Sequence, residues 1–276
     1  MLFKTIESLR SAPPTALFGI IVIALYTGVA IFAPVLAPYG ERAVVGGAYV
    51  PWSSDFPLGT DALGRDMLSR LIYGARNTLA IAFLATLFAF LIGTIFGLIA
   101  ATIGGWVDQF LSWIVEFLIS IPSLILSLLL LSIFGTSMFS LVLVIALVDS
   151  TRVFRVARSV AIGISAMEFV EAARLRGEGL LWIIRREILP SCTAPLLAEF
   201  GLRFCFVFLT IAALSFLGLG LQPPMADWGS MVRENASLIS FGDITPLLPA
   251  VAIGLLAVSV NFIVDWMLHR SSGLKD

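Results

Sequence analysis

The chain has 276 residues, 59% of them hydrophobic and 13% charged, and its formal net charge is −1. A water-soluble domain carries about 25% charged residues, so this composition, with a mean hydropathy of +1.02, excludes an ordinary soluble protein. The chain is expected to lie mainly in lipid, and its net charge gives no reason to expect a nucleic-acid partner.

The first apolar segment covers residues 17–37, which are 21 residues without a charge. The apolar part of a cleavable signal peptide has about 7–15 residues, so we expect an uncleaved transmembrane helix. Residues 58–76 then repeat apolar side chains at helical spacing, with Asp61 as the expected N-cap. They predict an amphipathic helix in the outer interface, with Arg65 and Arg70 directed towards lipid headgroups. A connector without a role in transport is the alternative.

Four further apolar runs follow, at residues 77–103, 109–148, 191–217 and 244–264. The second of these has 40 residues, or roughly 60 Å as a helix. It therefore predicts two transmembrane helices, joined by a turn at residues 134–137. The sequence thus predicts an all-α integral membrane protein with six transmembrane helices and both ends on one side.

The basic residues predict which side that is. With both termini in the cytoplasm, the inner segments hold 12 of the 17 lysines and arginines, including Lys4, Arg10 and Lys275, as the positive-inside rule requires. We divide the chain into residues 1–76, which hold the N-terminal tail, the first transmembrane helix and the external interfacial segment, and residues 77–276. The second part is a core of five transmembrane helices with a cytoplasmic segment at residues 165–190, through which a partner would be coupled.

Residues 149–190 form the one long predicted cytoplasmic segment. Its arginines 152, 155 and 158 recur every three residues and predict a basic anchor on one helical face. Ser165 and Glu168 fit a capping box, so a short helix is expected to follow and to stop at Gly177 in a left-handed cap. A second short helix is expected from residue 180 until Pro190 ends it. Two surface helices joined by a glycine bend favour a docking site for a partner protein over a simple loop.

The chain lacks the residues of several common active sites. Its only lysines are Lys4 and Lys275, neither of which belongs to a phosphate-binding loop, and its only histidine is His269. We therefore predict no catalytic residues and no metal site. Cys192 and Cys205 are expected to be reduced packing residues.

Charged residues inside the predicted spans are costly in lipid unless they have a partner or a function. Glu199 and Arg203 stand at i, i+4 spacing and predict a structural ion pair. Glu116 lies deep in its span and is a candidate for the transport pathway, whereas Asp149 is expected at a membrane interface. Gly93 and Gly97 form a G-x-x-x-G pattern, which predicts close packing with another helix.

Four stretches of the sequence resemble one transporter family. EAARLRG at residues 171–177, followed thirteen residues after Gly177 by Pro190, resembles the EAA motif of ABC importer permeases. Residues 57–76, 104–126 and 214–234 resemble the dipeptide, oligopeptide and nickel branch, and the short first external segment resembles its second permease subunit. Glu187 departs from the motif, which has an apolar residue there, and Glu116 replaces a more frequent aspartate.

The resemblance implies a type I ABC importer fold and a set of partners. These are a sister permease in a heterodimer, two ATPase subunits that hold ATP and Mg, and an external solute-binding protein that delivers peptides or a related small solute near residues 218–245. It implies a location in a bacterial or archaeal cytoplasmic membrane. The residues it assigns to ATPase coupling are Glu171, Ala172, Ala173, Gly177, Leu189 and Pro190. An ion-driven transporter or channel, and a membrane scaffold, are the alternatives.

Overall fold

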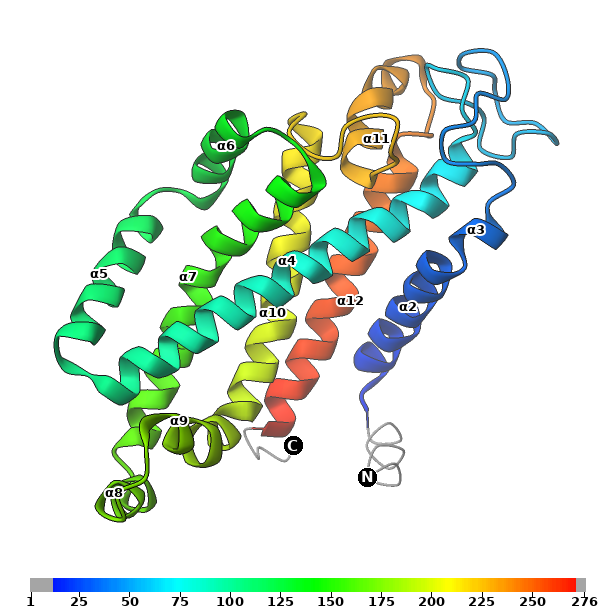
Figure 1. Ribbon diagram of the computed structural model, residues 1–276. Helices are drawn as coiled ribbons and strands as arrows, with labels where there is room; N and C mark the ends of the chain where they lie inside the picture. The colour runs from blue at the N-terminus through cyan, green and yellow to red at the C-terminus, as the bar shows by residue number, and fades with distance from the viewer. Residues whose placement is uncertain (1–11, 272–276) are drawn as a thin grey trace. The chain divides into compact units, whose positions relative to one another are not determined.

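The computed structural model describes residues 12–271, and most of them form helices (Figure 1). The chain makes two compact units. Unit 1 comprises the described residues up to 83, residues 131–141 and those from 208 onward, and unit 2 comprises residues 84–130 and 142–207. Four helices contribute residues to both units: α4 (Met67–Ile103), α6 (Ser123–Phe134), α7 (Met138–Ser165) and α10 (Leu189–Phe216).

Unit 1 is built around the first and last of the described helices. Its further helices are α2 (Pro14–Ile31), α3 (Ala33–Leu36), α11 (Trp228–Asn235), the 3₁₀ helix η2 (Ala236–Phe241) and α12 (Leu247–Ser271). Helix α2 packs beside α12 (Figure 1). A Cβ at Gly19 would lie 2.5 Å from the carbonyl oxygen of Ser259, so glycine is what allows the two backbones to approach this closely.

Unit 2 holds the second apolar core of the chain. Its further helices are α5 (Gly105–Ser120), α8 (Glu168–Leu175), α9 (Leu180–Ile183) and the π-helix η1 (Ile184–Ile188). One buried cluster joins side chains from α4, α7, α8, α9, η1 and α10: Leu98, Ala157, Ala161, Ile164, Val170, Ala173, Ile183, Ile184, Ile188, Cys192 and Leu196. Cys192 and Cys205 are both buried, and neither forms a disulfide with another described residue, as predicted.

Not every one of the six predicted membrane spans corresponds to a described helix that is long and apolar enough to cross a membrane. Within residues 12–271, four helical stretches are long and apolar enough to cross a membrane, namely α2, α4, residues 180–216 and α12. Helices α5 and α6 form a further pair that is bent by 90°. The sixth expected span, α7, is 28 residues long but carries Asp149 and three arginines. Length and composition therefore support up to five spans, and the predicted six depends on counting the charged helix α7.

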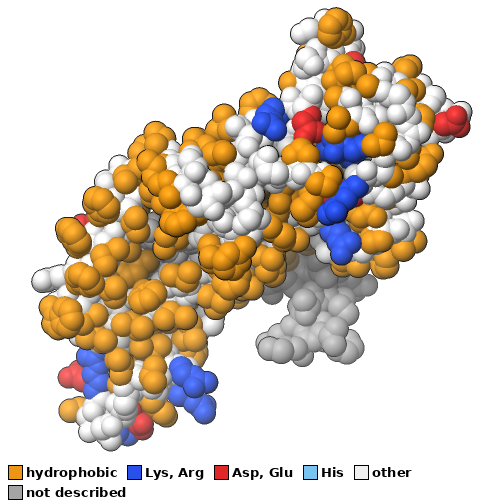
Figure 2. Space-filling view, turned by 45° about the horizontal axis from the view of Figure 1, so that its top comes forward, with side chains coloured by type: hydrophobic (Ala, Val, Ile, Leu, Met, Phe, Trp, Pro, Cys, Tyr) orange, Lys and Arg blue, Asp and Glu red, His pale blue; other side chains and the backbone are white. Residues whose placement is uncertain are grey.

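Apolar side chains are exposed over much of the surface. Hydrophobic atoms dominate the face seen in Figure 2, and charged side chains are few on it. Leu25 is 60% exposed, and Ile133 is 69% exposed. Soluble proteins rarely expose contiguous apolar area on this scale, so lipid or partner helices are expected to cover it.

The second span begins earlier than predicted. Helix α4 runs without interruption from Met67 and has 37 residues, or about 56 Å at about 1.5 Å per residue. There is thus no separate interfacial helix over residues 58–76, and the boundary placed at residue 76 falls inside a continuous helix. Asp61 is not its N-cap: Asp61 lies in the preceding loop, where its carboxylate accepts hydrogen bonds from the backbone N–H groups of Leu63 and Arg65, both at 2.9 Å. Asp in such a turn competes with helix formation.

The G-x-x-x-G pattern marks close packing inside unit 2. A Cβ at Gly93 would lie 2.5 Å from the carbonyl oxygen of Ser150 and 2.6 Å from Cβ of Val153. A Cβ at Gly97 would lie 2.9 Å from Cβ of Ala157. Helix α4 therefore packs against α7 through its glycines, and the predicted close contact is confirmed.

Gly93→Ala is expected to lower the stability of the protein by about 1–3 kcal/mol, because the added methyl overpacks the contact with α7. Gly163→Ala is the matched control, since a Cβ there meets nothing within 4 Å and alanine favours a helix. Thermal unfolding of the two purified variants measures the difference. Equal melting temperatures would show that α7 does not hold α4 at this distance.

Candidate functional site

Helix α8 begins two residues later than the expected capping box. Helix α7 continues through Ser165, and the N-cap of α8 is Met167, whose extended backbone makes no side-chain cap. The Ser165 hydroxyl is buried without a hydrogen bond among the described residues. The capping box is therefore wrong, because Ser165 still has helical geometry. The first turn of α8 contains Glu168 and Glu171. Both carboxylates interact favourably with the positive, N-terminal end of the helix dipole.

Gly177 ends α8 in the predicted left-handed conformation, with φ of 81°. Its N–H donates to the carbonyl of Arg174 at 2.9 Å, and the N–H of Glu178 donates to that of Ala173 at 3.2 Å. These two bonds make a Schellman motif. A Cβ at Gly177 would meet nothing within 4 Å, so the backbone conformation alone makes glycine favourable there.

The two alanines of α8 point to different environments. Val170 and Ala173 are fully buried in the unit 2 core. Glu171 and Ala172 are exposed, and Leu175 is 82% exposed. Ala172 therefore stands on the outward face that another protein would touch, whereas Ala173 fixes α8 to the rest of unit 2.

Pro190 does not end a helix. Helix α9, the π-turn η1 and α10 follow one another without a break over residues 180–216, and Pro190 lies in the first turn of α10. A proline lacks the N–H of the normal ladder and its ring clashes with the preceding turn. The wider π-turn immediately before it accommodates this loss. Leu189 and Pro190 are therefore at the join between η1 and α10.

Arg176 links the two sides of the glycine bend. Its guanidinium lies 3.9 Å from the carboxylate of Glu178 and 3.8 Å from that of Glu187. It also lies 5.9 Å from the ring centroid of Trp182. Because the Arg176 side chain is 54% exposed, each contact is weak. Glu187, which departs from the EAA pattern, is thus placed to contact α8 rather than the apolar core.

Helix α10 carries the ion pair that its i, i+4 spacing predicts. Arg203 donates to Glu199 through Nη2 at 2.8 Å and through Nε at 3.0 Å. Its Nη1 also lies 3.4 Å from Oδ1 of Asp149 on α7. Asp149 is only 4% exposed and is therefore buried within unit 2. Burial is tolerated because the Arg203 guanidinium is shared by two carboxylates.

Glu116 lies beside a basic cavity in unit 2. The cavity has a volume of about 810 Å³, and its lining includes Glu116, Arg152, Arg155, Arg158 and Arg203. The sequence predicted these arginines of α7 only as a basic anchor. In the structure they also form one wall of the cavity, and α5 forms the opposite wall.

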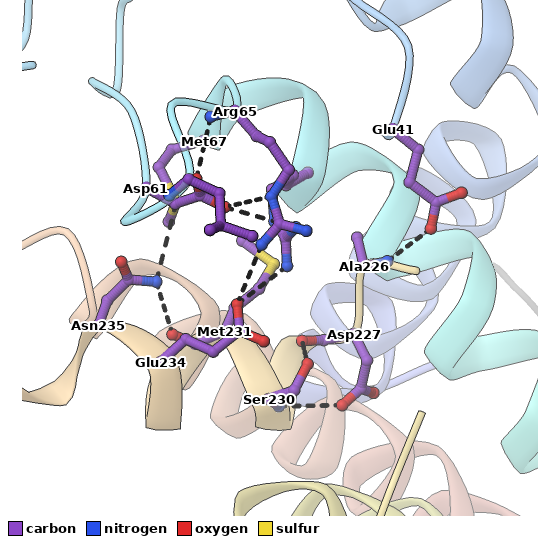
Figure 3. A network of polar contacts seen from close by, with 12 residues as sticks. Glu41, Asp61, Arg65, Met67, Ala226, Asp227, Ser230, Met231, Glu234 and Asn235 are labelled. Carbon is purple, nitrogen blue, oxygen red and sulfur yellow. Dashed lines mark hydrogen bonds and ion pairs between the residues drawn. The ribbon is translucent and has the colours of Figure 1, made fainter. Parts of the chain in front are cut away.

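A polar network in unit 1 connects the loop before α4 with α11 (Figure 3). Arg65 donates to Asp61 at 2.6 Å, and Arg70 donates to Glu234 at 3.2 Å. The side chains of Arg65 and Arg70 are 6% and 1% exposed. The sequence predicted that both would reach towards lipid headgroups. They are instead buried beside two carboxylates, the nearby Asp61 and the distant Glu234.

A second set of bonds joins the same loop and helix. Glu41 accepts hydrogen bonds from Asn77 at 2.7 Å and from the backbone of Ala226 at 2.5 Å. Asp227 caps α11 by accepting from the N–H of Ser230 at 3.0 Å, and also accepts from the Thr78 hydroxyl at 2.9 Å. Burial raises the pKa of the Asp227 carboxyl above its ordinary value. The loop before α4 and the segment before α11 are thus one ordered surface of unit 1.

Comparison with known proteins identifies the family. The model of the family described as "Binding-protein-dependent transport system inner membrane component" matches residues 93–272, which include α8 and the glycine bend. The chain belongs to this family. It is a permease subunit of an ABC importer, a multi-pass component of the inner membrane.

The permease resembles several named relatives over most of its length. It is 36% identical to the dipeptide transport system permease protein DppC of Alkalihalophilus pseudofirmus, over 95% of this chain and 84% of the relative. It is 31% identical to the glutathione transport system permease protein GsiD of Pectobacterium atrosepticum, over 92% and 83%.

Solved structures support the same fold at lower sequence identity. An inward-facing form of the MetNI methionine ABC transporter matches with a TM-score of 0.61 and 20% identity, over 75% of the permease and 98% of that chain. An amino acid ABC transporter crystallised with histidines matches with a TM-score of 0.55 and 21% identity, over 74% and 94%. The predicted type I importer fold is thereby confirmed.

Sequence reasoning missed two features of the permease. One is the ion pair of Asp108 with Arg158, in which Nη2 donates at 2.6 Å, and the other is the Arg70–Glu234 contact. Their partners stand 50 and 164 residues apart. No local spacing rule relates residues so distant, although an arginine inside an apolar helix is itself a signal that an acidic partner exists.

Proposed function

We propose that the permease forms half of a translocation pathway for peptides or a related small solute. The other half comes from a sister permease, an external binding protein delivers the solute, and two ATPase subunits hold ATP and Mg and drive the cycle. The names of the relatives, which include dipeptide and glutathione permeases, support a peptide-like solute.

The observation that carries the proposal is the construction of α8. One face of this short helix is buried in the unit 2 core through Val170 and Ala173, and the opposite face exposes Glu171, Ala172 and Leu175. Leu175, which is 82% exposed, adds an apolar side chain to this outward face. A groove in an ATPase subunit would cover it.

The path of the coupled motion follows from the same contacts. The core cluster that holds Val170 and Ala173 also holds residues of α4, α7 and α10. A displacement of α8 by the ATPases would therefore act directly on three long helices, because packed interiors transmit strain. Arg174, which donates to the carbonyl of Thr102 at 3.4 Å, adds a polar link from α8 to the end of α4.

The proposal also fixes the topology. Helix α8 and both chain ends are placed in the cytoplasm, and α11 and the loop before α4 are placed outside, where the binding protein would dock. The charge bias that supports this orientation includes Lys4, Arg10 and Lys275, which lie outside the described residues.

Glu171→Arg is expected to reduce co-purification of the ATPase subunits by about tenfold or more, because a reversed charge at an interface costs several kcal/mol. The measurement is a tagged pull-down of the permease from native membranes, with partners quantified by mass spectrometry. Glu168→Arg is the comparison variant, since it changes the same charge in the same turn of α8. Equal ATPase recovery with wild type and Glu171→Arg would contradict docking through this face.

A further inference from the structure

The basic cavity of unit 2 contains charged groups that have no ion-pair partner among the described residues. Four arginines line it, but two of them already have close carboxylate partners. Arg158 pairs with Asp108, and Arg203 pairs with Glu199. Arg152 has a weaker arrangement, at 3.8 Å from Asp149 and with 43% of its side chain exposed.

Arg155 and Glu116 are the unpaired groups of this cavity. Neither makes a hydrogen bond or ion pair with any other residue in the described range 12–271, and both line the space. Glu116 comes from α5 and Arg155 from α7, so the two charges belong to different walls. The Glu116 carboxylate is close enough to Arg158 for the two charges to attract. Charged groups near lipid are expensive unless a partner satisfies them.

The size and charge of the cavity define what would fit it. A volume of about 810 Å³ is within the range of about 300–1,000 Å³ that small-molecule sites have. A guanidinium offers a planar fork of N–H donors that matches a carboxylate. A free carboxylate in the same cavity matches an ammonium group. A small solute with a carboxylate at one end and an ammonium at the other is complementary to both.

We propose that this cavity is a binding site within the permease for the carboxylate end of a zwitterionic peptide, with Arg155 as the principal contact. Arg152 adds positive potential, and Glu116 receives the peptide ammonium. Arg158 and Arg203 are held by their own acidic partners and shape the wall. This inference rests on the proposed function. It adds that the permease itself recognises the two charged ends of its solute.

The test measures binding of radiolabelled dialanine to the complex purified with its sister permease and ATPases, without binding protein or ATP. Dialanine amide, which lacks the carboxylate, is expected to compete about tenfold more weakly than dialanine, because a charge-assisted contact is lost. Arg155→Gln is expected to bind dialanine about tenfold more weakly and to lose the preference for the free carboxylate. Arg155→Lys, which keeps the charge without the fork, is expected to retain part of it.

Glu116→Gln tests the other end of the site. This variant should keep the preference for dialanine over its amide but lose the preference over N-acetyl-dialanine, which lacks the ammonium. Arg42→Gln is the matched control, because Arg42 is exposed in unit 1 and is not part of this cavity. It is expected to bind dialanine as the wild type does.

Three results would overturn the proposal: no measurable binding of dialanine to the wild type, equal binding by wild type and Arg155→Gln, or a change in co-purified anionic lipid in Arg155→Gln without a change in peptide binding. The last result would assign the cavity to a lipid phosphate. ATP-driven peptide uptake, measured on the same preparation with binding protein, separates the two levels. If Arg155→Gln takes up peptide and still binds dialanine as the wild type does, only the proposed site is excluded. If the ATPases do not assemble with the permease, the proposed function itself is excluded.

Discussion

Gly177→Val is expected to reduce ATP-driven uptake about tenfold or more while the permease still inserts in the membrane. Gly177 has φ of 81°, and an L-residue in this conformation costs about 1–2 kcal/mol, with β-branched residues worst placed. The valine variant would relieve this strain by unwinding the Schellman turn, which redirects α8 relative to η1. Uptake into proteoliposomes, with membrane content measured by immunoblot, tests the expectation.

Gly179→Val is the matched control for this substitution. Gly179 stands two residues further on with φ of −72°, and a Cβ there also meets nothing within 4 Å. Valine is therefore compatible with its backbone, and uptake should change little. Gly177→Asn should recover part of the activity, because asparagine tolerates the left-handed region. Full uptake by Gly177→Val would mean that the bend does not transmit motion from the ATPases.

Arg70→Met is expected to destabilise the permease by about 3–5 kcal/mol, the usual cost of removing one partner from a buried ion pair. The Arg70 side chain is 1% exposed and lies within 3.4 Å of Asp61 and 3.2 Å of Glu234. Methionine fills similar space but leaves the charge of Glu234 poorly compensated. A lower apparent Tm of the purified complex, with faster proteolysis of the loop before α4, is the expected outcome.

Two comparisons make the Arg70 result specific. Arg76→Met changes an exposed arginine of the same helix that has no ion pair within the described part of the chain, and it should alter stability by no more than about 0.5 kcal/mol. Adding Glu234→Gln to Arg70→Met should restore part of the loss, because it removes the uncompensated charge. If the double variant is no more stable than Arg70→Met, the Arg70–Glu234 ion pair does not hold α11 to the loop before α4.

The two units place these effects in different parts of the transport cycle. The Arg70 network ties α11 to the loop before α4 in unit 1, and α8 and its core cluster belong to unit 2. A defect confined to delivery by the binding protein is therefore expected from unit 1, and a defect in coupling to ATP hydrolysis from unit 2. Basal ATPase activity of the assembled complex distinguishes the two.

Features that depend on residues close in sequence were determined by the sequence itself. The apolar runs, the Gly177 cap and the Glu199–Arg203 pair were all predicted, since each depends on side chains within about one or two helical turns or on glycine's own backbone freedom. The Gly93–Gly97 pattern predicted close packing with another helix, but it did not indicate that this helix is α7. The motif around Glu171 led to the correct family for the same reason, because it is one continuous stretch. What the sequence left open was which face of α8 turns inward.

Features that depend on distant partners were decided only by the tertiary structure. Arg70 was expected at lipid headgroups, yet Glu234, 164 residues away, buries it. Asp149 is buried beside Arg203 on another helix, 54 residues away, and no local spacing indicates that contact. Pro190 was expected to end a helix, yet a π-turn carries the chain past it. The energy of a buried charge depends on all the groups that surround it in the fold. Spacing along the chain therefore could not predict these positions, nor that Glu116 and Arg155 would line the same cavity.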